Sequence, residues 1–184
     1  MQHFTMLGTT DVLPLRLQLE RHSELWNQHT GRTAHEGSPH AEVSDVWLRW
    51  RPPAALVSPE SYNEPFAELE WYPAIAVLPA ARDILMQIMG RVGATAMGGA
   101  LITRVAPGKQ VKPHSDAMSF HAQYFRLKVY TVLRTNPNVV NWVEGESFVP
   151  KPGDVFAYDN LKSHAVYNEG DEDRWTMMAA FRCD

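Results

Sequence analysis

The feature that most constrains the fold is a change of pattern near residue 95. From there to the C-terminus, short apolar segments alternate with turn signals. The apolar segments are AMGGALITRVA, YFRLKVYTVLR, VVNWVE, GDVFAYD, SHAVYN and RWTMMAAFR, and the turns include PGK, NPN, EGE and KPGD. Gly, Pro and Asn are typical of tight turns. Short strands at this spacing predict a closed β-sandwich or barrel over residues 96–184.

The first 95 residues have a different character, with two helical patterns between polar loops. Apolar residues recur at helical spacing in residues 10–28 and in residues 79–92, the second of which begins with a proline. VWLRW, residues 46–50, alternates as a strand does and is followed by two prolines. Residues 30–45 and 51–73 are predicted to be loops.

Length and the absence of repeats predict one domain over residues 1–184, with a helical and loop part (1–95) ahead of the β-rich part (96–184). The net charge of −4 and the lack of a basic run argue against nucleic acid as a partner. Cys183 is the single cysteine, which excludes a disulfide framework within one chain. Because the sequence contains neither a signal peptide nor a membrane-length apolar run, a cytoplasmic enzyme or binding domain is expected.

His114 and Asp116 lie two positions apart in VKPHSD. Side chains two apart on a strand share one face, so both can approach one metal ion, and His164 can supply a third ligand. Two histidines and a carboxylate leave positions open on Fe(II) for oxygen and a co-substrate. The triplet alone is equally compatible with a turn in which Asp116 caps backbone amides.

Three cationic residues add to the metal interpretation. Arg174 follows His164 by ten residues and opens the last strand, so a neighbouring strand could bring its guanidinium group near the metal. Guanidinium groups pair with carboxylates through two hydrogen bonds. Arg126 and Lys128 are expected to share one face of their strand, and the alternative is a solvent-facing side with extended polar chains.

The ordered set PHSD, FRLKVY and WVEGESFVPKPGDVFAYDNLKSHAVYNEGDEDRW resembles the aspartyl/asparaginyl β-hydroxylase-like family of Fe(II)/2-oxoglutarate-dependent oxygenases. The resemblance covers roughly residues 95–182. It implies a mainly β protein with N-terminal helices, whose core is a double-stranded β-helix, the jelly-roll or cupin-like barrel. The implied activity is a dioxygenase reaction that hydroxylates an unactivated C–H bond, with Fe(II) as cofactor and 2-oxoglutarate and O2 as co-substrates.

Carried over to this chain, the resemblance implies that His114, Asp116 and His164 hold the iron. It implies further that co-substrate contacts come from two arginines, two threonines and a lysine, namely Arg174, Arg126, Thr103, Thr176 and Lys128. The family strand often has Arg-X-His where this chain has Arg-Leu-Lys, so the role of Lys128 is open. Some relatives have Gly in place of Asp116; the carboxylate here predicts a full triad and argues against halogenation.

The substrate is not evident from the sequence. A free amino acid or another small molecule is the first expectation, with Arg49, Trp47 and His121 as candidate contacts and residues 117–124 as a possible lid. The alternatives are hydroxylation of an Asp- or Asn-type side chain in a protein or peptide, and a non-catalytic metal-binding cupin that acts as a sensor. A nucleic-acid base is disfavoured by the charge balance.

Overall fold

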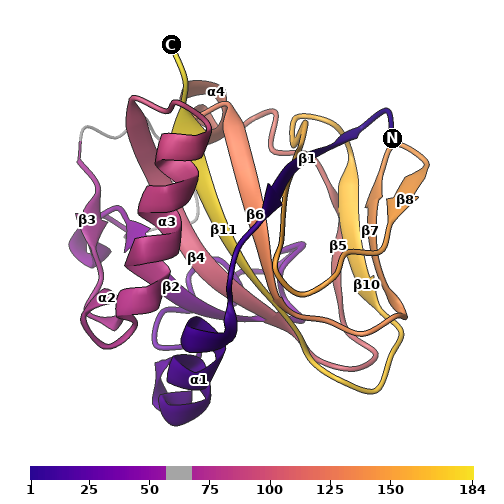
Figure 1. The fold of residues 1–184 in the computed structure, drawn as a ribbon, viewed down its shortest axis with the longest axis horizontal. Helices are drawn as coiled ribbons and strands as arrows, with labels where there is room; N and C mark the ends of the chain where they lie inside the picture. Colours follow the sequence, from indigo (N-terminus) through magenta and orange to yellow (C-terminus); the bar gives the residue numbers. More distant parts are fainter. Residues whose placement is uncertain (57–67) are drawn as a thin grey trace.

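The computed structural model describes residues 1–56 and 68–184, and two antiparallel sheets dominate it (Figure 1). The larger sheet contains, in spatial order, β1 (Phe4–Thr9), β9 (Asp154–Tyr158), β6 (Leu127–Arg134), β11 (Arg174–Arg182), β4 (Ala96–Val105), β2 (Ser44–Trp50) and β3 (Glu70–Trp71). The smaller contains β5 (Gln110–His114), β10 (His164–Asn168), β7 (Val139–Val143) and β8 (Glu146–Phe148). Two such sheets form a jelly roll, so the expected mainly β fold is confirmed.

Helices cover the outer face of the larger sheet (Figure 1). They are α1 (Leu13–Arg21), α2 (Ala74–Val77) and α3 (Pro79–Arg91), while α4 (Phe120–Tyr124) lies between β5 and β6; short 3-10 turns occupy Ser23–Leu25 and Pro53–Ala55. The helix expected over residues 79–92 is confirmed. The helix expected over residues 10–28 ends early, because His22 leaves helical geometry and a separate turn buries Leu25.

Strand β11 shows how the sheet is buried on both faces. Met177 and Phe181 point toward the helices and join the core formed with α1 and α3. Met178, one position on, joins the second core between the two sheets. Because side chains alternate along a strand, Arg174 and Thr176 fall on the same inner face as Met178. The position of these two polar residues inside the barrel therefore follows from the strand period.

All six apolar segments expected to form strands contain one: β4, β6, β7, β9, β10 and β11. Strand β1 was not expected, because its side chains are mostly exposed; it lies at the edge of the sheet, and among the described strands it pairs only with β9. The short strands β3 and β8 were not expected either. The loop predicted over residues 51–73 falls partly outside the described residues, since 57–67 are not described.

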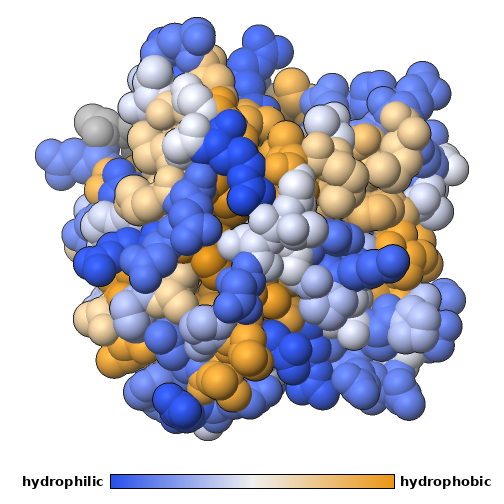
Figure 2. All heavy atoms as spheres, viewed as in Figure 1, coloured by the Kyte–Doolittle hydropathy of each residue, from blue (hydrophilic) through white to orange (hydrophobic). Residues whose placement is uncertain are grey.

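The face seen in Figure 2 mixes polar and apolar residues over the helices and the sheet edge. Among the described residues, no helix combines the length and the apolar character needed to cross a membrane.

Candidate active site

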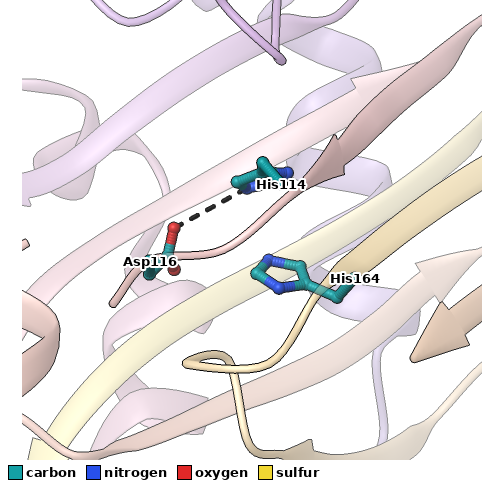
Figure 3. Close-up of side chains that lie close together, drawn as sticks. All are labelled: His114, Asp116 and His164. Atoms are coloured by element: carbon teal, nitrogen blue, oxygen red, sulfur yellow. Dashed lines mark ion pairs between the residues drawn. The ribbon is translucent and has the colours of Figure 1, made fainter. Parts of the chain in front are cut away.

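His114, Asp116 and His164 converge at one end of the smaller sheet (Figure 3). His114 ends β5 and His164 begins β10, and the two are direct partners in the antiparallel pairing of these strands. Asp116 follows β5 by two residues. One ligand atom from each side chain lies within 4.8 Å of the others. The three groups are therefore close enough to share one ion.

Each histidine ring is oriented by the backbone carbonyl two residues before it. Nδ1 of His114 lies 2.8 Å from the carbonyl oxygen of Lys112, and Nδ1 of His164 lies 2.9 Å from that of Lys162. A carbonyl only accepts, so each Nδ1 carries the proton and donates it. Both Nε2 atoms are left with a lone pair, which is the form that binds a metal.

The two carboxylate oxygens of Asp116 have different partners. Oδ2 accepts from Nζ of Lys128 at 2.7 Å and from Nδ2 of Asn160 at 2.9 Å. Oδ1 lies 3.6 Å from Nε2 of His114, the contact dashed in Figure 3. Oδ1 is thus the carboxylate oxygen that contacts the His114 imidazole, while Oδ2 is held by Lys128 and Asn160.

Electrostatics hold the three groups in their metal-binding protonation states. Burial, followed by the charge of His114, lowers the pKa of His164 to about 4. Burial likewise lowers the pKa of His114. For Asp116 burial alone would raise the pKa, but the charges of Lys128 and His164 and the hydrogen bonds to Oδ2 outweigh it and hold the pKa far below its usual range. Near neutral pH the site presents two neutral imidazoles and one carboxylate.

A small cavity of about 50 Å³ adjoins the histidines on the inner side of the barrel. Arg174, Thr176, Tyr130 and Tyr158 are among its lining residues. Arg174 donates from Nη2 to Asn141 at 2.9 Å, but its Nε is buried with no hydrogen-bond partner among the described residues, as is Oγ1 of Thr176. Burial lowers the pKa of Arg174 to about 10. A buried cation with unused donors is a ready site for a carboxylate.

A larger cavity of about 340 Å³ adjoins the smaller one and is lined by Asp116. Its wall combines polar side chains from the 30–45 loop, aromatic residues and the α4 helix; it is formed by Arg32, His35, His40, Trp50, Leu101, Asp116, Ser119, His121, Ala122, Phe125, Lys128, Asn160, Met178 and Ala180. Arg32, His40 and Lys128 line both cavities, so the two share a wall beside the carboxylate. The triad therefore opens on two adjoining spaces of different size.

Several residues singled out from the sequence lie at these cavities. Arg174, Thr176, Lys128 and Thr103 line the smaller cavity and His121 lines the larger one. Arg174, Thr176, Lys128 and Thr103 reach the smaller cavity because they occupy inward-facing positions of β4, β6 and β11, and such positions alternate along each strand.

The hydroxyl of Thr103 is already engaged in a buried network. It donates to Oδ1 of Asp45 at 2.9 Å and accepts from Nη2 of Arg32 at 3.0 Å. Arg32 also pairs with both carboxylate oxygens of Asp45, whose side chain is fully buried. The network fixes the 30–45 loop over the mouth of the barrel.

Three expected site residues lie elsewhere. Arg126 is exposed and lines two outer cavities instead of the co-substrate cavity, because β6 starts at Leu127 and the alternating pattern begins only there. Arg49 donates to the carbonyls of Met97 and Leu69 and lies over the ring of Trp71. Trp47 packs in the core between the sheets and lines neither cavity.

Asn160 and Asn141 were not identified from the sequence, although both bind a site residue directly. Asn160 belongs to the DNLKS turn just before His164, so its position next to a candidate ligand was the available signal. Asn141 carries no such signal. It reaches Arg174 only through the packing of the two sheets.

A jelly roll with two histidines and a carboxylate beside an arginine-lined cavity has the architecture of a non-haem Fe(II) oxygenase. The particular family is given by residues 65–183, which match aspartyl/asparaginyl β-hydroxylase. The chain therefore belongs to the aspartyl/asparaginyl β-hydroxylase family, and it is a hydroxylase that uses Fe(II) and 2-oxoglutarate.

Two solved structures have a similar fold. An oxidoreductase of the 2OG-Fe(II) oxygenase family from Burkholderia pseudomallei aligns with 76% of this chain and 67% of its own, with a TM-score of 0.55 and 13% identity. The viral collagen prolyl hydroxylase of Paramecium Bursaria Chlorella virus-1, in its 2OG complex, aligns over 99% and 97% with a TM-score of 0.54 and 8% identity. No curated protein sequence matches the chain.

Proposed function

We propose that His114, Asp116 and His164 bind Fe(II), that Arg174 binds the distal carboxylate of 2-oxoglutarate, and that the substrate is a small molecule such as an amino acid. The observation that carries the proposal is the pair of adjoining cavities at the triad, which share Lys128 in their walls; one is lined by Asp116, and the other contains an unsatisfied buried guanidinium group. The iron, when bound, supplies the activation of O2 that hydroxylation of a C–H bond requires.

The donor atoms fit both groups. The Nε2 atoms of His114 and His164 and one oxygen of Asp116 are a ligand set suited to Fe(II), with positions left for small molecules. Nε of Arg174 and Oγ1 of Thr176 are buried donors with unmet hydrogen-bonding capacity, and a carboxylate would satisfy both. The protein residues thus bind, orient and exclude water around the reacting groups.

The larger cavity supports a small substrate. Its volume of about 340 Å³ lies at the lower end of ordinary ligand pockets. His121 contributes to its wall, and burial lowers the pKa of this imidazole to about 3, so it contacts a ligand in neutral form. A single Asp- or Asn-type side chain of a peptide is the alternative occupant. Membership of a hydroxylase family argues against a non-catalytic sensor.

We also propose that residues 1–184 act as one oxygenase domain. The N-terminal strand β1 pairs with β9, β2 pairs with β4, and β3 pairs with β2, so the helical and loop part contributes three strands to the same sheet as the β-rich part. The 30–45 loop supplies Arg32, His35 and His40 to the larger cavity.

An anaerobic titration tests the site assignment. Adding Fe(II) and then 2-oxoglutarate should produce the visible metal-to-ligand charge-transfer band of the chelate, and His114→Ala should remove it. After O2 is admitted, succinate formation would be followed with free amino acids and, separately, with peptides that contain Asp or Asn. Turnover with peptides alone would favour the alternative substrate, and an unchanged band in His114→Ala would exclude the proposed metal site.

A further inference from the structure

We propose that Lys128 is a positioning residue for the carboxylate of Asp116. With the amide of Asn160, its ammonium group holds Oδ2, so that Oδ1 alone is presented to the metal. The inference rests on the proposed function in one respect, namely that Asp116 is a metal ligand. It gives a role to the lysine found where the family strand often has histidine.

The geometry at Oδ2 leaves that oxygen fully engaged. It accepts from Nζ of Lys128 at 2.7 Å and from Nδ2 of Asn160 at 2.9 Å, both short hydrogen bonds. Asn160 holds Asp116 a second time, because the backbone carbonyl oxygen of Asn160 accepts a hydrogen bond from the backbone N–H of Asp116 at 3.0 Å. Asn160 is 2% exposed, so its two hydrogen bonds to Asp116 come from a buried residue.

The three residues come from three separate segments of the chain, so their contacts form only when the chain is folded. Lys128 is the second residue of β6 and points into the barrel from the larger sheet. Asn160 lies in the turn between β9 and β10, and Asp116 follows β5. The side chains of Lys128 and Asp116 are each 18% exposed, so their ion pair is screened less than a surface pair.

Because Oδ2 is hydrogen-bonded and Oδ1 is left for the metal, the number of coordination positions that Asp116 occupies is affected. A carboxylate that binds through both oxygens occupies one more coordination position than a carboxylate that binds through one. An Fe(II) site of this type needs open positions for its co-substrate and for O2. By engaging Oδ2, Lys128 and Asn160 favour binding through Oδ1 alone and keep that position open.

Two other roles for Lys128, contact with 2-oxoglutarate and a purely electrostatic effect on the metal, predict different results when its charge is removed. Lys128 lines both cavities, so its ammonium group could instead contact 2-oxoglutarate. In that case removing the charge would weaken 2-oxoglutarate binding and leave metal binding unchanged. If Lys128 positions Asp116, the metal is affected first. If it acted only as a nearby positive charge, its removal would tighten metal binding.

The experiment compares the wild type with Lys128→Met, Lys128→Arg and Asn160→Ala, using Co(II) in place of iron. Metal dissociation constants are measured by competition with a chelator, the visible d–d spectrum of Co(II) reports coordination, and 2-oxoglutarate is titrated into the Co(II)-loaded proteins. Lys151→Met removes an exposed lysine that lines neither cavity and is the matched control. Asp116→Ala tests the underlying ligand assignment. Circular dichroism verifies that each variant is folded.

Lys128→Met should weaken Co(II) binding about tenfold, the lower end of the range for residues that orient metal ligands. Its d–d bands should change in intensity, because the carboxylate can then bind through both oxygens. Lys128→Arg, which keeps a cationic donor, should restore most of the wild-type spectrum, and Asn160→Ala should shift it in the same direction as Lys128→Met by a smaller amount. Lys151→Met should match the wild type.

Unchanged Co(II) affinity and spectrum in both Lys128→Met and Asn160→Ala would overturn the inference, as would tighter Co(II) binding in Lys128→Met. A weaker affinity for 2-oxoglutarate with an unaltered Co(II) spectrum would assign Lys128 to the co-substrate instead. If Asp116→Ala bound Co(II) as the wild type does, the ligand assignment of the proposed function would fail. That result is separate from a failure of the positioning role.

Discussion

The chemistry of individual residues at the metal cluster is set by their nearest backbone and side-chain neighbours. His114 and His164 use the same device, a carbonyl two residues earlier that takes the Nδ1 proton. Asp116 is oriented by Lys128 and Asn160. A histidine or carboxylate in a sequence carries only the capacity to bind a metal, and these neighbours fix which atom is offered.

Arg174 allows a direct test at this scale. We expect Arg174→Met to raise the 2-oxoglutarate dissociation constant of the Co(II)-loaded protein by about 100-fold, because a buried carboxylate would lose its cationic partner. Co(II) affinity should stay unchanged, since Arg174 is no part of the metal cluster. Isothermal titration calorimetry measures both constants.

Arg134→Met is the matched control for this variant, because Arg134 pairs with Glu172 at the surface and lines neither cavity. It should bind 2-oxoglutarate as the wild type does. Equal affinity in Arg174→Met and the wild type would show that the co-substrate carboxylate lies elsewhere.

Among the elements, the packing of α4 against β4 depends on two adjacent glycines in β4. His121 of α4 accepts the backbone N–H of Gly99 at 2.8 Å, and a Cβ on Gly98 would lie 2.7 Å from that same imidazole nitrogen. A Cβ on Gly99 would overlap the ring of Trp50. The glycine pair therefore lets a lining helix and an indole ring pack directly on the strand backbone.

We expect Gly99→Ala to destabilise the protein by about 1–3 kcal/mol, the usual cost of overpacking a filled core, because Trp50 must move. Gly90→Ala is the control: this position lies in α3 and a Cβ there meets nothing within 4 Å. Alanine there should stabilise the helix by up to about 1 kcal/mol. Urea unfolding of the two variants should shift the midpoint in opposite directions, and a neutral Gly99→Ala would contradict the packing described.

At the scale of the whole molecule, the larger sheet is buried between the helices and the smaller sheet. The barrel interior therefore encloses several titratable groups, and burial dominates the pKa values of His121 and His164, lowering them to about 3 and about 4. The ordinary histidine pKa is about 6.5. Between these values the unfolded chain binds more protons than the folded protein.

The metal-free protein should therefore lose stability as pH falls below about 6.5, with the loss continuing to about pH 3 and full stability retained above pH 6.5. Each buried neutral histidine contributes up to about 1.4 kcal/mol per pH unit within its window. His121→Gln, whose amide oxygen can still accept from Gly99, should show a shallower dependence. Urea unfolding at a series of pH values measures this, and parallel curves for the variant and the wild type would refute it.

The sequence by itself determined the fold class and the triad candidates. Alternating apolar segments predict which strands form. Side chains two positions apart on a strand share a face, so the sequence predicts that Arg174 and Thr176 lie on one side of β11. Family motifs supplied the rest of the ligand set. These features lie within single segments of the sequence, so they can be recognised without knowing which strands pair.

Only the tertiary structure decided what depends on where a strand begins and on which segments meet. Arg126 and Lys128 have the same spacing as a pair on one face, yet β6 starts between them and only Lys128 enters the barrel. The contacts of Asn160 with Asp116 and of Arg32 with Asp45 join positions 44 and 13 residues apart. Because such contacts arise from strand register and loop packing, no spacing in the sequence encodes them.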